Sequence, residues 1–506
     1  MMKVEDQRVK SLYDYLDRIT QIAYQDEYLT TMAVLSRGPF CENFLKQFKP
    51  NHPLIKTTQF YIFKNVLFYY IKNTTRYFIQ LFKLVAHFFS GQNYNIDAST
   101  KNLVLIDVSI FPKYILINKN FICKHFPDLE ETIKKQGKAY ALTSKFFESN
   151  NLFQLYKSFK ILKEKKRPVL TEFQILEFSD YILAFKFLLV YPFHVMRFIK
   201  QLGSEPEDKF LIHTIFGTLD DPSLLYYFQI LYGRRISLLP AKKIKCISWY
   251  ENQPRDKCFY RGLRMIKGKV VVYGAQLFIY PSNLGTINPE IGEIKFGVVP
   301  DKIIVNGSLF LPEKSPIEYR IGPSLRYKKI FQIRANPTQS ENILVLLSYF
   351  EPENRHVLNL INKADLKQPI LIKFHPYFNQ KKLKVRVGQG VQVVQDNHLD
   401  LIARSKIVIG MATGTLAEAA SLGIPAININ IEGEFSEFSP GFMPEFGKGI
   451  IWDNASNTSE VVGLVNFFNT LMDTKPEKIE EMGKKYKEIF FSQPLEQKII
   501  EAFDLK

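Results

Sequence analysis

Two short segments near the carboxy-terminal end of the sequence combine residue types that bind phosphate groups. In the first, the apolar run 369–374 ends in a His375-Pro376 turn. In the second, residues 410–418 (Gly-Met-Ala-Thr-Gly-Thr-Leu-Ala-Glu) form a small, hydroxyl-rich turn that opens a helix. A helix start offers free N–H groups and the positive end of the helix dipole. The two segments together predict an enzyme that uses a nucleotide-activated donor.

His375 is the predicted centre of the first segment. It directly follows a predicted strand, Ile370–Phe374, and therefore lies at the carboxyl end of that strand, where parallel sheets bind ligands. Pro376 forces an abrupt exit and fixes the direction of the imidazole, which can donate to a phosphate oxygen and stabilise a departing nucleotide. Lys373 points the same way by strand periodicity. A lone turn histidine is more often bonded to backbone, and only the partner segment favours the functional interpretation.

The second segment supplies hydroxyl groups and a carboxylate. The hydroxyls of Thr413 and Thr415 are predicted phosphate contacts, and Gly414 lets the backbone approach the ligand. Glu418, one turn into the helix, is predicted to accept from ribose hydroxyls. Thr415-x-x-Glu418 is also a capping box in its own right. Capping and ligand binding are compatible because a cap leaves other N–H groups available.

A catalytic carboxylate is expected in the amino-terminal half. The predicted strand Ile244–Ser248 runs into a dense polar and aromatic cluster, in which Glu251 is the predicted general base or nucleophile. The cluster also supplies predicted supporting contacts at Gln253, Arg255 and Lys257. The plainer interpretation is a helix-capping turn with solvated charges.

Several weaker candidates complete the predicted site. Asp220 and Asp221 are alternative catalytic carboxylates, although Asp-Pro before a helix is more often a plain N-cap. Cleft-lining loops are predicted at Tyr273–Gln276, where Gln276 is a substrate contact, and at Asn283–Asn288. Arg326 is predicted to reach a donor phosphate or an acidic sugar.

Regular alternation of short strands and helices after residue 340 predicts a doubly wound parallel sheet. The expected strands are 343–349, 370–374, 391–394, 407–410, 426–431 and 449–452, and the expected helices are 354–364, 399–403, 415–422, 458–472 and 478–490. A second α/β region precedes it, with strands expected at 103–109, 138–143, 209–214, 244–249, 269–273 and 302–305. Its predicted helices include 172–200, broken at Pro192, and 222–232, ended by Gly233. Residues 306–340, rich in Pro, Gly and Ser, are the expected linker.

Bulk composition agrees with a large globular protein carrying a basic surface. The 506 residues exceed the size of one core, and a net charge of +17 fits nucleic acid, an anionic membrane or anionic substrates. No zinc-knuckle, RNP-like or arginine-rich pattern supports nucleic acid. Thr57–Ser90 is an aromatic helix without acids, and its Lys72, Arg76 and Lys83 share one face. Such a helix fits a membrane surface, or equally a core helix whose lysines face water. No uninterrupted apolar run reaches the roughly 18 residues of a spanning helix.

With these motifs assembled, the chain resembles GT-B glycosyltransferases that build bacterial surface glycans. Lys-Phe-His375-Pro376 is similar to the His-Pro motif of capsular Kdo transferases and bacterial sialyltransferases, where it contacts a CMP-linked donor. A serine pair of those families is replaced here by Thr413 and Thr415, and Glu251 is the nearest counterpart of their catalytic acid. The resemblance covers roughly 340–480, is thin over 100–330 and does not extend to 1–100.

The sequence pattern and the resemblance together predict a division of the chain into four parts. Residues 1–100 form a helical, basic region that is a candidate for a membrane surface, and residues 101–325 form a Rossmann-like acceptor domain. Residues 326–490 form a Rossmann-like domain that binds the nucleotide sugar, and residues 491–506 form a terminal helix that crosses back to the amino-terminal domain. The resemblance implies no bound metal or other cofactor. It also implies a glycan or lipid-linked acceptor and a cytoplasmic enzyme, peripheral on the inner face of the plasma membrane. Three alternatives remain: a CDP-glycerol-type polyol phosphotransferase, a sugar-nucleotide 2-epimerase and a non-catalytic membrane-docked assembly factor.

Overall fold

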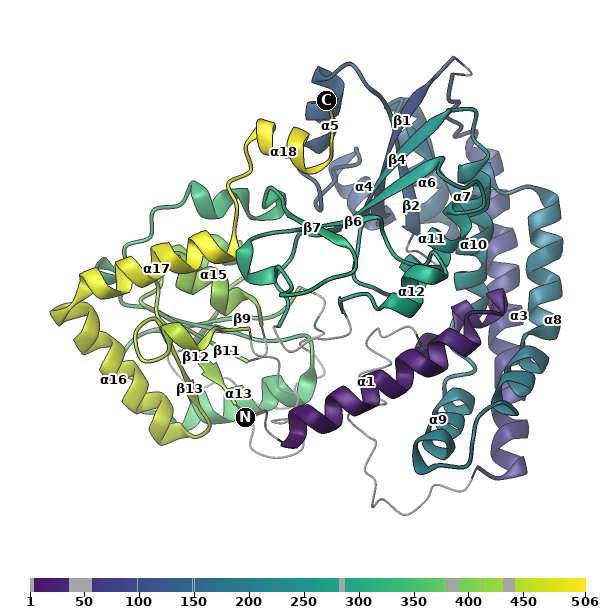
Figure 1. Ribbon diagram of the computed structural model, residues 1–506. Helices are drawn as coiled ribbons and strands as arrows, with labels where there is room; N and C mark the ends of the chain where they lie inside the picture. The colour runs from purple at the N-terminus through teal and green to yellow at the C-terminus, as the bar shows by residue number, and fades with distance from the viewer. Residues whose placement is uncertain are drawn as a thin grey trace.

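Two parallel β-sheets, each covered by helices, form the protein in the computed structural model (Figure 1). The structure describes residues 4–35, 57–97, 99–147, 149, 151–281, 287–376, 378, 380, 391–411, 413–430 and 442–506. The predicted fold class, two Rossmann-like α/β domains with an added helical amino-terminal region, is confirmed. The predicted loop Asn283–Asn288 lies mostly outside the described residues.

The first sheet has seven parallel strands in the order β3-β2-β1-β4-β5-β6-β7. Their bounds are β1 Asn102–Ile110, β2 Ala139–Phe147, β3 Val169–Leu170, β4 Lys243–Trp249, β5 Val270–Gln276, β6 Lys302–Val305 and β7 Glu318–Ile321. The central strands are continuous apolar runs because helices cover both faces. The helices of this part are α4 Pro112–Asn118, α5 Leu129–Lys135, α6 Leu152–Glu164, α7 Glu172–Ile175, α8 Phe178–Ile199, α9 Pro206–Gly217, α10 Ser223–Ser237, α11 Pro254–Leu263 and α12 Ile291–Lys295.

The amino-terminal helices pack against this first domain. Helix α1 (Val4–Ala23) contacts α12, and the long helix α3 (Gln59–Ser90) lies against α6, α8, α9 and α10. Side chains such as Leu16, Tyr24 and Tyr69 are fully buried in the same core as residues of the first sheet.

The second sheet has six parallel strands in the order β10-β9-β8-β11-β12-β13. They are β8 Ile343–Leu346, β9 Ile370–Lys373, β10 Val391–Val393, β11 Ile407–Gly410, β12 Ala426–Ile429 and β13 Trp452–Ala455, and they alternate with α13 Glu351–Lys363, α14 His398–Ala403, α15 Thr415–Ser421, α16 Thr458–Thr474 and α17 Pro476–Phe490. After α17 the chain returns to the first domain as α18 (Glu496–Ala502) (Figure 1). There Asp504 accepts from Lys302 and Arg320 at 2.9 and 2.8 Å.

Two predicted boundaries in the first domain are wrong for identifiable reasons. Residues 209–214, expected as a strand, belong to α9, which begins with Pro206 and a capping box between Glu205 and Asp208. Gly233 does not end its helix, because α10 continues to Ser237. A Cβ on Gly233 would lie 2.4 Å from the Phe259 carbonyl oxygen of α11, so this glycine permits a close helix crossing.

Three further expectations need correction. Helix α8 runs through Pro192, whose ring lies on the buried face between Tyr191 and Val195, so that packing offsets the lost backbone bond. The expected linker 306–340 contains β7, the edge strand of the first sheet. The expected strand 449–452 begins only at Trp452, because Gly449 takes a positive φ of 72° within the preceding turn.

Candidate functional site

A pocket of about 260 Å³ opens at the carboxyl edge of the first sheet, between the ends of β1 and β4. Strand order reverses between these two strands, since β2 and β3 follow β1 on one side and β5 to β7 follow β4 on the other. Ligands bind open α/β sheets at such a switch point, outside the carboxyl ends of the strands. The pocket therefore occupies the position where this fold offers a binding site.

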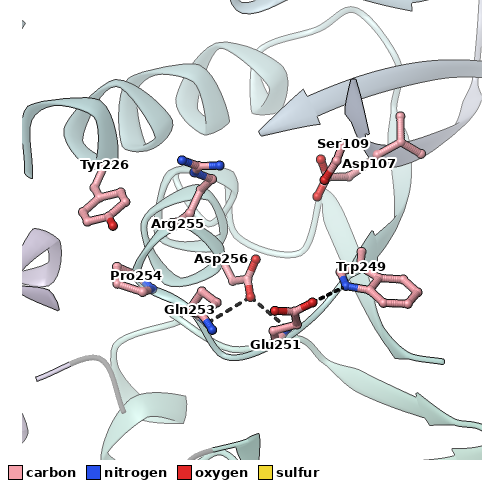
Figure 2. A pocket seen from close by; sticks show the side chains of 10 residues that line it. Asp107, Ser109, Tyr226, Trp249, Glu251, Gln253, Pro254, Arg255 and Asp256 are labelled. Carbon is pink, nitrogen blue, oxygen red and sulfur yellow. Dashed lines mark hydrogen bonds between the residues drawn. The ribbon is translucent and has the colours of Figure 1, made fainter. Parts of the chain in front are cut away.

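Glu251 lines this pocket, as Figure 2 shows. Its Oε1 accepts from the indole N–H of Trp249 at 2.7 Å, and its backbone N–H donates to Asp256 Oδ2 at 3.0 Å. Asn252 next to it is fully buried with a φ of 56°, a left-handed conformation that asparagine tolerates better than most residues. This tight turn holds the Glu251 carboxylate at the edge of the pocket.

Gln253 and Arg255 also line the pocket, and the structure gives each a further role. Gln253 forms a capping box with Asp256 at the start of α11, so the plainer capping interpretation of this segment is confirmed for Gln253. Arg255 lies close to Glu172: burial raises the pKa of Glu172, and the charges of Lys83 and Arg255 oppose that rise. Lys257, a predicted supporting contact, is instead fully buried in an ion pair with Glu293.

Asp107 and Ser109 at the end of β1 are pocket residues that the sequence analysis missed. Asp107 is fully buried, and its Oδ2 accepts from the Ser248 hydroxyl at 2.7 Å, which in turn accepts from Tyr260 at 2.8 Å. An acid near the carboxyl end of an otherwise apolar buried strand was the available signal.

Asp220 and Asp221 lie in the turn between α9 and α10 and do not line the pocket. Asp220 pairs with Lys72 of α3, and Arg76 donates to its carbonyl oxygen at 2.6 Å. Neither aspartate caps α10, whose N-cap is Pro222. Burial raises the pKa of Asp221 to about 6, and the neighbouring Asp220 adds to the rise. Their geometry is that of an anchor for α3.

In the second domain, His375 follows β9 at the carboxyl edge of the sheet. The ring is half-buried and packs edge-on against Tyr349, with centroids 5.7 Å apart. Burial lowers the pKa of His375, which favours the neutral ring. Lys373 Nζ donates to the Gln395 carbonyl oxygen at 3.4 Å, and Pro376 is exposed. Tyr349, an exposed ring at the end of β8, was missed because it was counted as part of the strand.

The turn Thr413–Thr415 follows β11, two strands from β9 in the sheet. At about 4.8 Å between neighbouring strands, its backbone lies roughly 10 Å from that of His375 at the same edge. Thr413 Oγ1 donates to Thr415 Oγ1 at 3.0 Å, so the two hydroxyls are adjacent. The backbone N–H groups of residues 415–418 all have acceptors within the turn, at 3.1–3.3 Å. The helix start therefore offers fewer free donors than predicted, and the hydroxyls are its main polar groups.

Glu418 does not form the predicted capping box. The N-cap of α15 is Gly414, which places Thr415 inside the helix. The Glu418 carboxylate pairs with His398 Nε2 at 2.9 Å and is largely buried. His398, at the start of α14, is a partner of Glu418 that the local sequence pattern does not predict.

The carboxyl edges of the two sheets meet at the Thr413–Thr415 turn. A Cβ on Gly414 would lie 3.0 Å from the side chain of Ile279, which follows β5 of the first sheet. Ile279 N–H also donates to the Tyr327 hydroxyl at 3.1 Å, and the negative charge of Glu418 helps raise the pKa of buried Tyr327. The pocket side of one domain therefore faces the histidine and threonine side of the other.

The remaining predicted contacts lie elsewhere. Gln276 is fully buried, and its amide donates to the Ile287 carbonyl oxygen at 3.0 Å, a position that does not favour substrate contact. Arg326 is exposed beside the ring of Tyr327, 6.0 Å from its centroid.

Comparison with known proteins gives weak structural likenesses and no family. No protein-family model and no curated protein matches the chain. Among solved structures, MurG of Acinetobacter baumannii aligns over 80% of this chain and 99% of its own, with 11% identity and a TM-score of 0.38. The UDP-GlcNAc 2-epimerase of Neisseria meningitidis bound to UDP-GlcNAc aligns over 80% of this chain and 100% of its own, with 12% identity and a TM-score of 0.41. The wall teichoic acid polymerase TagF aligns over 89% of this chain and 97% of its own, with 11% identity and a TM-score of 0.38. At these TM-scores the likenesses assign neither a family nor an activity.

Proposed function

We propose that the protein is a glycosyltransferase that moves a sugar from a nucleotide-activated donor, favouring a CMP-linked acidic sugar, to a lipid-linked or growing surface glycan. The observation that carries the proposal is the meeting of two carboxyl sheet edges. One edge bears a carboxylate-lined pocket, and the other bears His375 and the paired hydroxyls of Thr413 and Thr415. An acceptor on one side and a donor on the other would then react between the domains.

The donor side would hold the nucleotide. His375, whose neutral form is favoured by burial, donates one ring N–H to a phosphate oxygen, and the Thr415 hydroxyl, which accepts from Thr413, donates to another of its oxygens. The ammonium of Lys373 adds positive charge at the same edge. The exposed ring of Tyr349 offers a surface on which the base can stack.

The acceptor side would supply the base. Glu251 takes the proton from the acceptor hydroxyl, whose oxygen forms a bond to the anomeric carbon. The bond from that carbon to the donor phosphate breaks, and the nucleotide leaves with the electron pair and the phosphate charge. Asp107, hydrogen-bonded to Ser248, and Asp256 are the other carboxylates that line this pocket. The enzyme acts from the cytosol, peripheral on the inner face of the plasma membrane.

A nucleotide panel tests the donor assignment. Thermal shift with CMP, CDP, UDP and GDP is measured on the wild type and on His375→Ala. Ligand at 100 times its Kd stabilises the folded state by roughly 2.7 kcal/mol, which is readily seen. CMP should give the largest shift, and His375→Ala should abolish it. A larger UDP shift would favour the epimerase alternative, a larger CDP shift would favour the polyol phosphotransferase, and no shift with any nucleotide would favour the assembly factor.

Catalysis is tested by Glu251→Gln, which keeps the side-chain shape and an acceptor for the Trp249 N–H. The variant should bind nucleotide normally and turn over at least ~100-fold more slowly. Glu481→Gln, the same substitution at an exposed position of α17 in the second domain, is the matched control. Unchanged turnover in Glu251→Gln, with loss in Asp107→Asn, would move the base to Asp107.

A further inference from the structure

Helix α3 has its polarity reversed relative to an ordinary surface helix. Its buried side chains are Tyr69 and five polar residues: Asn73, Gln80, Lys83, His87 and Ser90. Its exposed face is apolar and includes Phe60, Phe63, Phe82 and Phe89, which are 75%, 66%, 56% and 70% exposed. Leu67, Ile71 and Phe78, also exposed, continue the pattern between Phe63 and Phe82 at helical spacing, so the residues form one stripe. A helix of a soluble domain places these residue types the other way round.

Helix α8 carries a second stripe of the same kind. Phe178, Ile182, Phe185, Leu189 and Phe193 follow one another at intervals of three or four residues and are 46–80% exposed. Its opposite face is fully packed: the ring of Phe187 stacks on Tyr227 of α10 with centroids 4.4 Å apart. Among the described residues, α8 is the one helix long and apolar enough to cross a membrane. Its packed face shows that it belongs to the first domain instead.

The two stripes form one surface. Tyr69 donates to the Leu188 carbonyl oxygen at 3.2 Å and Tyr77 donates to that of Tyr181 at 3.1 Å, so the helices are antiparallel neighbours, as Figure 1 shows. Around each helix axis, the apolar stripe lies about a quarter turn away from the side that contacts the other helix, at 3.6 residues per turn. Because the two helices run in opposite directions, both rotations bring the stripes to the same side of the pair. The apolar residues of α3 and α8 therefore face outward together.

The charged residues of α3 and α8 are almost all basic. Within α3 and α8 the only acid is Asp180, which is buried and accepts from Arg235 at 2.7 Å. Lys64, Lys186 and Arg197 are exposed along the two helices. The predicted basic stripe lies toward the first domain: Lys72, still half exposed, and Arg76 bind Asp220, and Lys83 is buried near Glu172.

We propose that the outward face of α3 and α8 inserts into the interfacial region of an anionic lipid bilayer, with both helices in the plane of the membrane. The aromatic and aliphatic side chains enter the acyl boundary, and the flanking cations contact anionic headgroups. This inference deepens the membrane location of the proposed function by naming the surface. A second copy of the chain is a poorer occupant, because it would bring the same cations face to face.

Vesicle sedimentation of the full-length protein tests the proposal, with phosphatidylcholine vesicles containing or lacking 30% phosphatidylglycerol. The wild type should bind the anionic vesicles, and Phe63→Ser/Phe193→Ser should lower partitioning at least ten-fold. Lys186→Glu/Arg197→Glu should weaken binding to the anionic vesicles alone. Ile291→Ser/Met265→Ser removes side chains that are 71% and 59% exposed elsewhere and should bind like the wild type.

Insertion depth gives an independent readout. Both native tryptophans, Trp249 and Trp452, are buried, so Phe193→Trp introduces an exposed reporter. Its emission should shift to the blue on vesicle addition and be quenched by brominated acyl chains, whereas Ile291→Trp should respond to neither. Vesicle binding requires no nucleotide, so its failure would leave the proposed chemistry standing.

Three results would overturn the proposal. They are no binding of the wild type to anionic vesicles, an equal loss in the Ile291/Met265 control, or a lipid-free dimer that the Phe63/Phe193 variant converts to monomer. The last result would identify the face as a contact between copies. Near-ultraviolet circular dichroism of each variant shows whether the fold is intact.

Discussion

Removing the charge of Asp221 should stabilise the protein at neutral pH and leave it unchanged in acid. Burial and the neighbouring Asp220 raise the pKa of Asp221 from 3.8 to about 6, despite the opposing charges of Arg76 and Lys72. Its Oδ2 is buried and accepts no hydrogen bond within the described residues. The folded state therefore holds an ionised carboxylate at pH 7 in a site that favours the neutral form.

The size and sign of the change in the free energy of unfolding follow from the difference between the folded and unfolded pKa values of Asp221. A group whose pKa is higher in the folded state contributes stability that is fully present below the unfolded value, here 3.8, and lost as pH rises through about 6. A shift of about 2 units corresponds to at most about 3 kcal/mol. Because this turn is only partly buried, solvent screening reduces the expected effect to about 1–2 kcal/mol.

Thermal unfolding of Asp221→Asn at pH 4.5 and pH 8 measures this effect. The variant should melt several degrees above the wild type at pH 8, at roughly 2–4 °C per kcal/mol for a domain of this size. The difference should be clearly smaller at pH 4.5, which lies between the unfolded and folded pKa values of Asp221. Asp220→Asn is the control, because it loses a partly exposed ion pair with Lys72. Equal shifts at both pH values, or destabilisation at pH 8, would refute the electrostatic argument. A large loss of turnover in Asp221→Asn would instead restore Asp221 as a catalytic candidate.

Two further predictions concern packing within the first domain. Gly262→Ala should destabilise by about 1–3 kcal/mol in chemical denaturation, since the new Cβ would lie 2.1 Å from the Ile230 carbonyl oxygen. Gly463→Ala, in α16 of the second domain with nothing within 4 Å of the new Cβ, is the control and should stabilise by about 0.5–1 kcal/mol. Stabilisation by both substitutions would contradict the close crossing of α10 and α11. Glu293→Gln should cost about 3–5 kcal/mol because it leaves fully buried Lys257 without its anionic partner. The double variant Lys257→Met/Glu293→Gln should recover part of that lost stability. No recovery would show that loss of the ion pair does not account for the destabilisation.

Local sequence pattern was sufficient for most of the second domain. The strands at 370, 391, 407 and 426 and the helices after them were predicted within a few residues, because buried parallel strands are apolar runs and their helices have a clear period. The pattern also located His375 and Thr413–Thr415 at a carboxyl sheet edge. Glu251 was found in the same way, from its place after a strand.

The pattern was insufficient where a distant segment decides the outcome. Gly233 stops a helix in isolation, but α11 packs against it and the helix continues. Thr415-x-x-Glu418 is a capping box locally, but His398 takes the carboxylate. Gln276 resembles a loop residue, but the carbonyl of Ile287 holds it in the core.

The sequence by itself determined the two α/β domains, the order of their elements and the residue types at each strand end, since these depend on periodicity over a few residues. Only the tertiary structure decided which face of α3 is buried. The spacing of Lys72, Arg76 and Lys83 defines one helix face whatever its surroundings, and acidic groups of the first domain turn that face inward. The apolar stripe is left outside because a helix of fixed geometry that turns its basic side toward the domain must expose the opposite side.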